Sequence, residues 1–178
     1  MERKKGQSAM EYLMTYGWAI LVIIIVIAVL FYIGVLNPRN VTPSTCTFPP
    51  GISCQSFKLV SVTTQIDLTI GQATGHAISV TGLICTQESG APATFPSTTW
   101  LAGNIGIPQG EYRKIANGSA TGGTNNLVKC RDSQGVPLIA PSNAVGEFYK
   151  GKLWINYTEQ DTSVVRIQQG DIAAKWEV

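Results

Sequence analysis

Residues 7–36 read QSAMEYLMTYGWAILVIIIVIAVLFYIGVL, and the last 19 of them, Trp18 to Leu36, contain no charged side chain. A bilayer hydrocarbon core of about 30 Å needs roughly 20 apolar residues of helix, so this run is long enough to span a membrane. It is apolar all round rather than on one face, which is typical of a helix that is buried or surrounded by lipid. We therefore expect a long N-terminal helix over residues 7–37, ending where Pro38 disfavours helical geometry in the residue before it.

The charges around this helix predict its orientation. Arg3, Lys4 and Lys5 stand directly ahead of it. Lys and Arg concentrate on the cytoplasmic side of a first membrane segment, so residues 38–178 are expected to face outward. Without residues 1–6, ten basic and ten acidic side chains remain and no basic cluster is present. This balance argues against a nucleic-acid-binding protein.

The order of residues at the front of the helix differs from an ordinary secretory signal. A secretory signal has an apolar core of about 7–15 residues followed by a small-residue cleavage site. Here the apolar core is longer, and no Ala-x-Ala pattern follows it before Pro38. Instead, Lys4-Lys5-Gly6-Gln7-Ser8-Ala9-Met10-Glu11-Tyr12-Leu13 places a basic pair, a glycine, a glutamine and an acid ahead of the apolar run. This order resembles the class III signal peptide of archaeal type IV pilins, the subunits of adhesive pili.

The resemblance implies a processing step and an assembly. A prepilin peptidase would recognise Lys4, Lys5, Gly6 and Gln7 and cut between Gly6 and Gln7, which makes Glu11 the fifth residue of the mature chain. Gln7 and Glu11 are then the expected assembly residues. The helix would span the membrane before assembly and form the core of a homopolymeric filament after it, with the pilus assembly machinery as a partner. The expected packing residues of that core are Leu13, Trp18, Ile20, Leu21, Ile24, Ile27, Leu30 and Phe31.

Glu11 is the one acidic residue inside the helix. A charged carboxylate within a membrane helix costs on the order of 2.5–3.5 kcal/mol on insertion scales, so such a residue usually has a partner or lies near the interface. Cleavage before Gln7 would create an ammonium group close by, and the amine of one subunit would meet the Glu11 carboxylate of a neighbour. The plainer interpretation is a solvated carboxylate at the membrane surface.

The rest of the chain is expected to form an outward-facing antiparallel β-sandwich of immunoglobulin-like type, so the fold class is α+β. We expect a cleaved leader at 1–6, a Pro/Thr/Ser-rich connector at 38–56 and the β domain at 57–178. Residues 87–111 should be loops with at most one short strand near 99–101, and Asn117-Gly118 signals a hairpin. Alternating apolar residues predict strands within 57–70, 77–86, 112–116, 127–130, 147–158, 163–168 and 172–178.

Four cysteines, an even number, are typical of an oxidising compartment. Cys46 and Cys54 flank the turn signal at 48–51 and are expected to pair locally, which leaves Cys85 and Cys130 for a longer bridge. Four cysteines allow three connectivities, so this pairing is one choice among three. Three glycosylation acceptor patterns begin at Asn40, Asn117 and Asn156.

The sequence offers little for an enzyme or a metal site. His76 is the only histidine and lies in an expected turn, there is no Cys-x-x-Cys, and no Gly-x-Ser-x-Gly or phosphate-binding loop is present. We expect no catalysis, cofactor or metal. Of the tryptophans, Trp154 and Trp176 fall in strand patterns, whereas Trp100 is the better candidate for an exposed ligand contact.

The favoured interpretation is therefore an adhesive filament subunit, made as a precursor in the cytoplasmic membrane and displayed on the cell surface. Its adhesion target has no motif in this sequence. Two alternatives remain: a binding module for sugars or peptides on an uncleaved membrane anchor, and an archaeal flagellin-like subunit, which would share the leader and the helix-plus-β plan.

Overall fold

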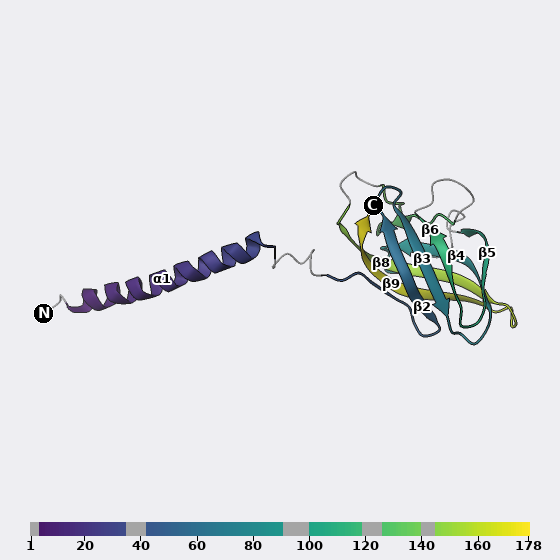
Figure 1. The fold of residues 1–178 in the computed structure, drawn as a ribbon, viewed down its shortest axis with the longest axis horizontal. Coiled ribbons are helices and arrows are strands. Elements are labelled where there is room, and N and C mark those ends of the chain that lie inside the picture. The colour runs from purple at the N-terminus through teal and green to yellow at the C-terminus, as the bar shows by residue number, and fades with distance from the viewer. Residues whose placement is uncertain (1–3, 35–41, 91–99, 119–125, 140–144) are drawn as a thin grey trace. The chain divides into compact units, whose positions relative to one another are not determined.

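The protein is described by a computed structural model, in which residues 4–34, 42–90, 100–118, 126–139 and 145–178 are described. The chain divides into two compact units, Met1–Thr42 and Pro43–Val178. The first contains a helix and the second contains β-strands (Figure 1).

The N-terminal unit is one helix, α1, over Lys4–Tyr32. At 1.5 Å per residue, its 29 residues extend for about 43 Å. The N–H of Ile33 donates to Val29 O at 2.9 Å, and Gly34 then takes a φ of 75°. Such a left-handed glycine is a common helix terminus because it lacks a Cβ. The helix thus ends at Tyr32, earlier than the Pro38 argument predicts, and the predicted end at residue 37 lies outside the described residues.

The second unit is built from nine described strands: β1 (Thr45–Thr47), β2 (Ile52–Val60), β3 (Gln65–Gln72), β4 (Ile78–Thr86), β5 (Trp100–Ile107), β6 (Tyr112–Asn117), β7 (Cys130–Arg131), β8 (Phe148–Glu159) and β9 (Val165–Glu177). Hydrogen-bonded neighbours follow the order β5-β4-β8-β9-β2-β3-β6, with β1 beside β9 and β7 beside β4. Most pairs are antiparallel, but β2–β9 and β4–β7 are parallel. The expected helix followed by a mainly antiparallel β domain is confirmed in this coarse form.

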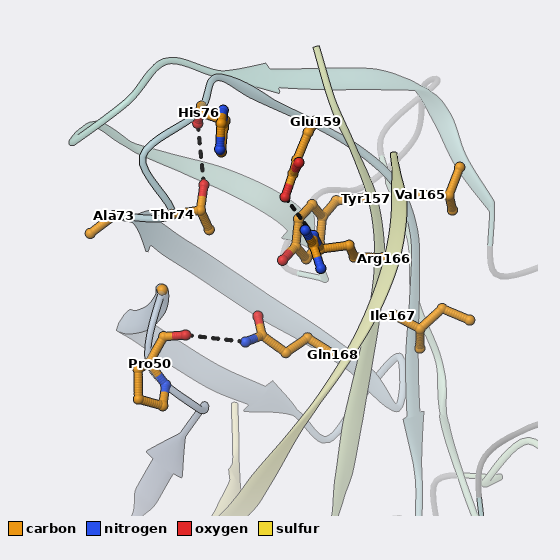
Figure 2. A pocket seen from close by; sticks show the side chains of 11 residues that line it. Pro50, Ala73, Thr74, His76, Tyr157, Glu159, Val165, Arg166, Ile167 and Gln168 are labelled. Atoms are coloured by element: carbon orange, nitrogen blue, oxygen red, sulfur yellow. Dashed lines mark hydrogen bonds and ion pairs between the residues drawn. The ribbon is translucent and has the colours of Figure 1, made fainter. Parts of the chain in front are cut away.

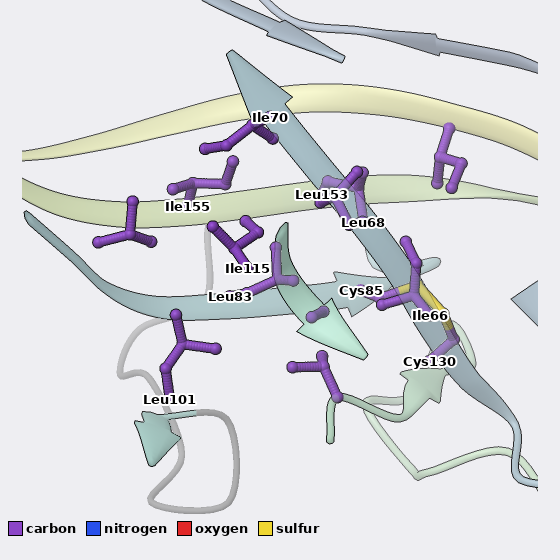
Figure 3. Close-up of a cluster of buried hydrophobic side chains, with 14 of the residues drawn as sticks. Ile66, Leu68, Ile70, Leu83, Cys85, Leu101, Ile115, Cys130, Leu153 and Ile155 are labelled. Atoms are coloured by element: carbon purple, nitrogen blue, oxygen red, sulfur yellow. A yellow bond between two sulfur atoms is a disulfide. The ribbon is translucent and has the colours of Figure 1, made fainter. Parts of the chain in front are cut away.

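The long strand β9 belongs to both halves of the sheet. Most of its length pairs with β8, whereas its end, at Trp176 and Glu177, pairs with Leu59 and Val60 of β2. One continuous path of pairing therefore joins strands that lie in two layers. Figure 3 shows β3 crossing β8 with apolar side chains between them. The sheet folds over its own core, rather than forming the two separate antiparallel sheets expected from the sequence.

The core fills the space between these layers. The strand predicted within 147–158 is present as β8, and its Leu153, Ile155 and Tyr157 are at most 3% exposed. They meet side chains from β3 and β4, including Leu68 and Leu83 (Figure 3). Burying such a side chain contributes about 1.5–3 kcal/mol. The larger fully buried side chains are Leu59, Ile66, Leu68, Ile70, Ile78, Leu83, Ile107, Ile115, Tyr149, Leu153, Ile155 and Ile172.

Several expected boundaries were wrong. The connector predicted at 38–56 contains β1 and the first five residues of β2. The predicted loop at 87–111 contains the eight-residue strand β5, whose Ile107 is fully buried opposite Ile78. Glycines 103 and 106 read as strand breakers, but packing of the neighbouring apolar residues against β4 outweighs their low strand propensity.

The two strands expected at the end of the chain are also wrong. The strands predicted at 163–168 and 172–178 are one strand, β9, which passes through Gly170 without a break. A Cβ at Gly170 would lie 2.5 Å from the ring of Phe48, so the glycine allows close approach of the chain after β1.

Two further boundaries near β6 and β7 differ from prediction. Asn117-Gly118 does not join a hairpin, because β6 pairs with β3 whereas β7 pairs with β4. The strand expected at 127–130 is the two-residue β7, Cys130–Arg131.

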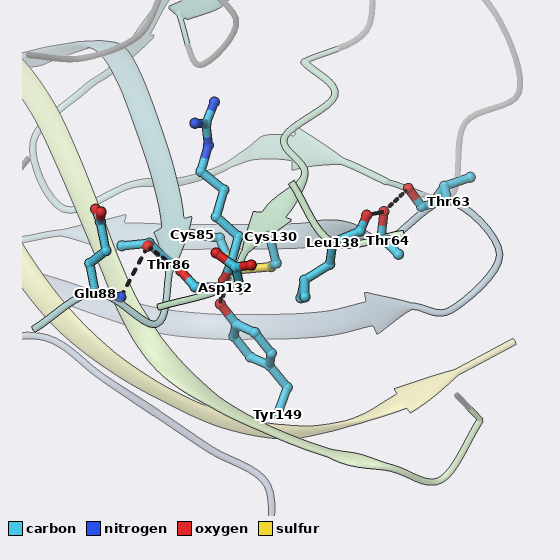
Figure 4. Close-up of a disulfide and its surroundings, with 10 residues drawn as sticks. Thr63, Thr64, Cys85, Thr86, Glu88, Cys130, Asp132, Leu138 and Tyr149 are labelled. Carbon is cyan, nitrogen blue, oxygen red and sulfur yellow. Dashed lines mark hydrogen bonds between the residues drawn. A yellow bond between two sulfur atoms is a disulfide. The ribbon is translucent and has the colours of Figure 1, made fainter. Parts of the chain in front are cut away.

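Two disulfides are present, Cys46–Cys54 and Cys85–Cys130, and they have the pairing expected from the sequence. Cys85 and Cys130 lie opposite each other on β4 and β7 and are fully buried. The nearby Tyr149 hydroxyl donates to Arg131 O at 3.0 Å (Figure 4). Burial of Tyr149, with the Asp132 carboxylate nearby, raises the pKa of this phenol. The second bridge thus fixes one end of the core.

Gly151 supplies a stability prediction. A Cβ there would lie 2.7 Å from both Thr86 O and the ring of Tyr149, and neither can retreat without disturbing the sheet or the core. We expect Gly151→Ala to lower the free energy of unfolding by about 1–3 kcal/mol, the usual cost of overpacking. Thermal denaturation measures the loss. Gly103→Ala is the matched control, since Gly103 also lies within a strand, β5, but no atom lies within 4 Å of its Cβ position. Equal losses of stability in the two variants would contradict this account.

Candidate functional sites: the apolar helix and a polar cleft

The apolar side chains of α1 are uncovered. Its exposed large hydrophobic side chains, from Met10 to Tyr32, have exposed fractions between 38% and 94%. Within the described residues, one helix is long and apolar enough to cross a membrane, Met10–Tyr32. An apolar helix of this length near the N-terminus is typical of a membrane anchor, a signal sequence or a protein contact.

The residues expected to pack a filament core lie on this surface. Leu30 is half-buried, and the side chain of Leu13 is outside the described ones. The other six are exposed: Trp18, Ile20, Leu21, Ile24, Ile27 and Phe31. Residues 4–7 of the predicted cleavage site belong to α1, but the side chains of Lys4, Lys5 and Gln7 are likewise not described. The helix therefore includes the predicted cleavage position.

Glu11 is exposed on α1. Thr15 Oγ1, one turn along, donates to the backbone oxygen of Glu11 at 2.8 Å, so this hydroxyl is satisfied within the helix. The rings of Tyr12 and Tyr16 lie beside each other, with centroids 4.3 Å apart.

The glycosylation candidates differ in accessibility. Asn40 lies outside the described residues. Asn117 ends β6 half-buried, and its Oδ1 accepts a hydrogen bond from Lys114 Nζ at 2.7 Å. Asn156 lies within β8 and is only 9% exposed. A glycan is bulky and needs a surface position, so Asn156 is a poor acceptor in the folded domain, contrary to the sequence-based expectation.

Trp154 and Trp176 lie in strands as predicted, β8 and β9, and both are buried, at 8% and 6% exposed. Trp100 begins β5 instead of lying in a loop, and its side chain is outside the described ones.

A polar cleft of about 770 Å³ opens where the two layers of the β domain separate (Figure 2). One wall is formed by β8 and β9, which contribute Tyr157, Glu159, Arg166 and Gln168. The turns at the ends of β2 and β3 form the other wall: Pro50, Gly51, Ala73, Thr74 and His76. The cleft thus replaces the apolar core at this end of the domain.

Two ion pairs lie in and beside the cleft. His76 Nδ1 and Asp161 Oδ2 are 2.5 Å apart and tie the β3–β4 turn to the β8–β9 turn. Glu159 is buried at 4% exposed, and its Oε1 accepts from Arg166 Nε at 2.5 Å. Thr162 Oγ1 donates to the second oxygen, Oε2, at 2.7 Å. The hydrogen bonds from Thr162 and Arg166 lower the pKa of Glu159. The buried carboxylate is therefore fully paired.

The same cluster contains the ligand types of a metal site. One ligand atom each from His76, Glu159 and Asp161 lie within 4.8 Å of one another. The Arg166 guanidinium beside Glu159 opposes a cation, and all three side chains already have partners. Metal binding would first have to break two ion pairs, so we assign no metal to this cluster. The sequence reasoning missed it because residues 76 and 159–166 are far apart in the chain.

The exposed His76–Asp161 pair predicts a pH dependence. Its hydrogen bond raises the pKa of His76 above 6.5 and lowers that of Asp161 below 3.8. The stabilisation is therefore present between these two values, and it is lost as the pH rises through the folded pKa of His76 or falls through that of Asp161. We expect His76→Gln to lower the melting temperature at about pH 5 more than at about pH 8. Equal losses at both pH values would contradict a role for this pair.

Searches against protein-family models, curated proteins and solved structures returned no match to this chain.

Proposed function

We propose that this protein is the structural subunit of a type IV pilus-like filament of the archaeal kind, polymerising through α1 after cleavage between Gly6 and Gln7. One observation carries the proposal: the apolar surface of α1 is uncovered along nearly its whole described length. Such a surface needs lipid before assembly and copies of itself afterwards. The resemblance of residues 4–13 to a class III signal peptide favours the second state.

Burial between copies would supply the driving force for polymerisation. Each Å² of apolar surface removed from water contributes about 25 cal/mol, and a helix that is apolar all round can contact several neighbours at once. The stiff β-branched side chains from Val22 to Ile27 suit such packing, because they lose little rotamer freedom on burial.

The β domain is proposed to form the outer surface of the filament. Its two disulfides are typical of an oxidising compartment, which agrees with an extracellular location for residues 43–178. We interpret its two layers as a variant of the immunoglobulin-like sandwich, and we propose adhesion rather than catalysis as its role. Asn40 and Asn117 stay the candidate glycosylation positions.

N-terminal sequencing of the extracellular form tests the proposal. We expect a chain that begins at Gln7, recovered in filaments sheared from cells. A shed or membrane-bound chain that retains residues 1–6 and stays monomeric would overturn it. That outcome would favour the second candidate, an uncleaved anchor carrying a binding module, which the polar cleft supports. A chain that begins at Gln7 but forms a rotary filament would identify the flagellin-like alternative.

A further inference from the structure

We propose that the cleft is a binding site for a single extended peptide segment, neutral and rich in hydroxyl side chains, which pairs with the free edge of β9. This inference concerns the β domain and does not depend on polymerisation through α1. It follows from the path of β1, the orientation of side chains along β9 and the charges of the cleft.

The chain itself already uses part of this edge. β1 pairs antiparallel with β9, with Thr45, Cys46 and Thr47 opposite Ala173, Ile172 and Asp171. Beyond β1 the chain passes Pro49 and Pro50, which have no N–H to continue a ladder. Gln168 Nε2 donates to Pro50 O at 3.3 Å, and the pairing of the chain with the edge of β9 that begins at β1 ends there. On this side, the edge from Val165 to Ile167 has no strand partner among the described residues.

The cleft begins where this pairing along β9 ends. Val165 and Ile167 line it, although Figure 2 shows their side chains pointing away from it. Their side chains therefore contribute nothing to the cleft, but an unpaired strand edge keeps backbone N–H and C=O groups free to pair with another strand. Exposed edges are templates for another strand, and natural proteins often protect them with lysine, proline or a bulge. This one carries β-branched Val165 and Ile167, which are 62% and 55% exposed.

The shape of the cleft selects a single segment. Pro50, Gly51, Ala73 and Thr74 form a wall opposite the free edge, on the other side of an open cleft. A whole sheet from a second copy would meet this wall, whereas one extended strand needs only the usual spacing of about 4.8 Å from its neighbour. The volume of about 770 Å³ lies within the usual range of ligand sites. Addition of a strand to an exposed edge is a recurring mode of peptide recognition.

The polar groups of the cleft indicate the kind of peptide. Its ionisable side chains are already paired, Arg166 with Glu159 and His76 with Asp161, so a charged peptide would have to disrupt a pair. Gln168 Oε1 is buried and no donor among the described residues reaches it, which leaves one acceptor to be satisfied. The sequence that β9 already accepts on this edge is Thr45-Cys46-Thr47, small and neutral. A peptide of threonine and serine is small and neutral, and its hydroxyl groups can donate to Gln168 Oε1.

Amide hydrogen exchange of the full chain in detergent tests the site, with a capped six-residue peptide of alternating threonine and serine as the probe. At about 1 mM peptide, we expect the cleft-facing amides within Val165–Ile167 to exchange at least about tenfold more slowly. Ala73→Trp, at an exposed position on the opposite wall, should abolish this slowing. Val62→Trp is the matched control, since Val62 is 75% exposed in the β2–β3 turn, at the other end of that hairpin.

Four results would overturn the proposal. The first is unchanged exchange in the wild type at this peptide concentration, and the second is equal slowing in Ala73→Trp. The third is slowing of the same amides with rising protein concentration and no peptide, which would assign the edge to a second copy of the chain. The fourth is equal protection by a neutral oligosaccharide, which would show that a strand is not required. Because the readout is local to β9, it is independent of whether filaments form.

Discussion

Replacing Glu11 with alanine is expected to leave cleavage between Gly6 and Gln7 intact while filament yield falls by at least about two orders of magnitude. The carboxylate is exposed on α1. Removing a charge from an apolar helix makes membrane insertion easier, by about 2.5–3.5 kcal/mol on insertion scales. A loss of filaments therefore cannot arise from failed insertion. It would report a missing partner in the assembly, where a neighbour's new N-terminal amine pairs with Glu11.

The size of the effect follows from that pairing. A buried charge left without its partner costs about 3–5 kcal/mol, and each 1.4 kcal/mol is a factor of ten in subunit affinity. Yield is measured as protein in the sheared filament fraction, together with N-terminal sequencing of the membrane fraction. Glu11→Gln keeps the side-chain size and should fail similarly. Thr15→Val is the matched control, because the Thr15 hydroxyl is already satisfied by the Glu11 backbone oxygen. Filaments of normal length in Glu11→Ala would remove the carboxylate from the mechanism.

How much of this molecule the sequence predicts depends on whether the signal is local. The apolar run that forms α1 is a local feature, and so is the alternation of Leu153, Ile155 and Tyr157 on β8. Both are confirmed, apart from the end of α1 at Tyr32. The disulfide pairing was also reached from local signals, a turn between Cys46 and Cys54 and strand ends at the other two cysteines.

The errors concern features set by distant contacts. Gly170 looks like a break in a strand, yet it is required because Phe48 lies against it from 122 residues earlier in the chain. The cleft has the same origin. His76 and Asp161 are separated by 85 residues and meet only because β4 pairs with β8. Single-sequence patterns carry no information on such pairings, so the free edge of β9 could not be predicted.

Removal of the Cys85–Cys130 disulfide is the largest stability change that we expect. The bridge has a sequence separation of 45 residues, whereas Cys46–Cys54 has a separation of 8. Constraint of the unfolded chain grows with loop length, which gives about 4 kcal/mol for the longer loop and about 2.5 kcal/mol for the shorter. Both sulfurs of the longer bridge are also in the core, so their loss leaves unfilled space.

Urea unfolding of the detergent-solubilised chain measures the difference. In a Trp18→Phe background, which removes the signal of α1, fluorescence of the buried Trp154 and Trp176 reports on unfolding of the β domain. We expect the double alanine variant at Cys85 and Cys130 to lose at least about 4 kcal/mol, enough to leave a marginal domain largely unfolded at growth temperature. The variant at Cys46 and Cys54 is the matched control and should stay folded. If the control loses as much stability, or more, loop length does not determine how much each disulfide stabilises the domain. The contact of β1 with β9 must then contribute more stability than the burial of the Cys85–Cys130 bridge at β7.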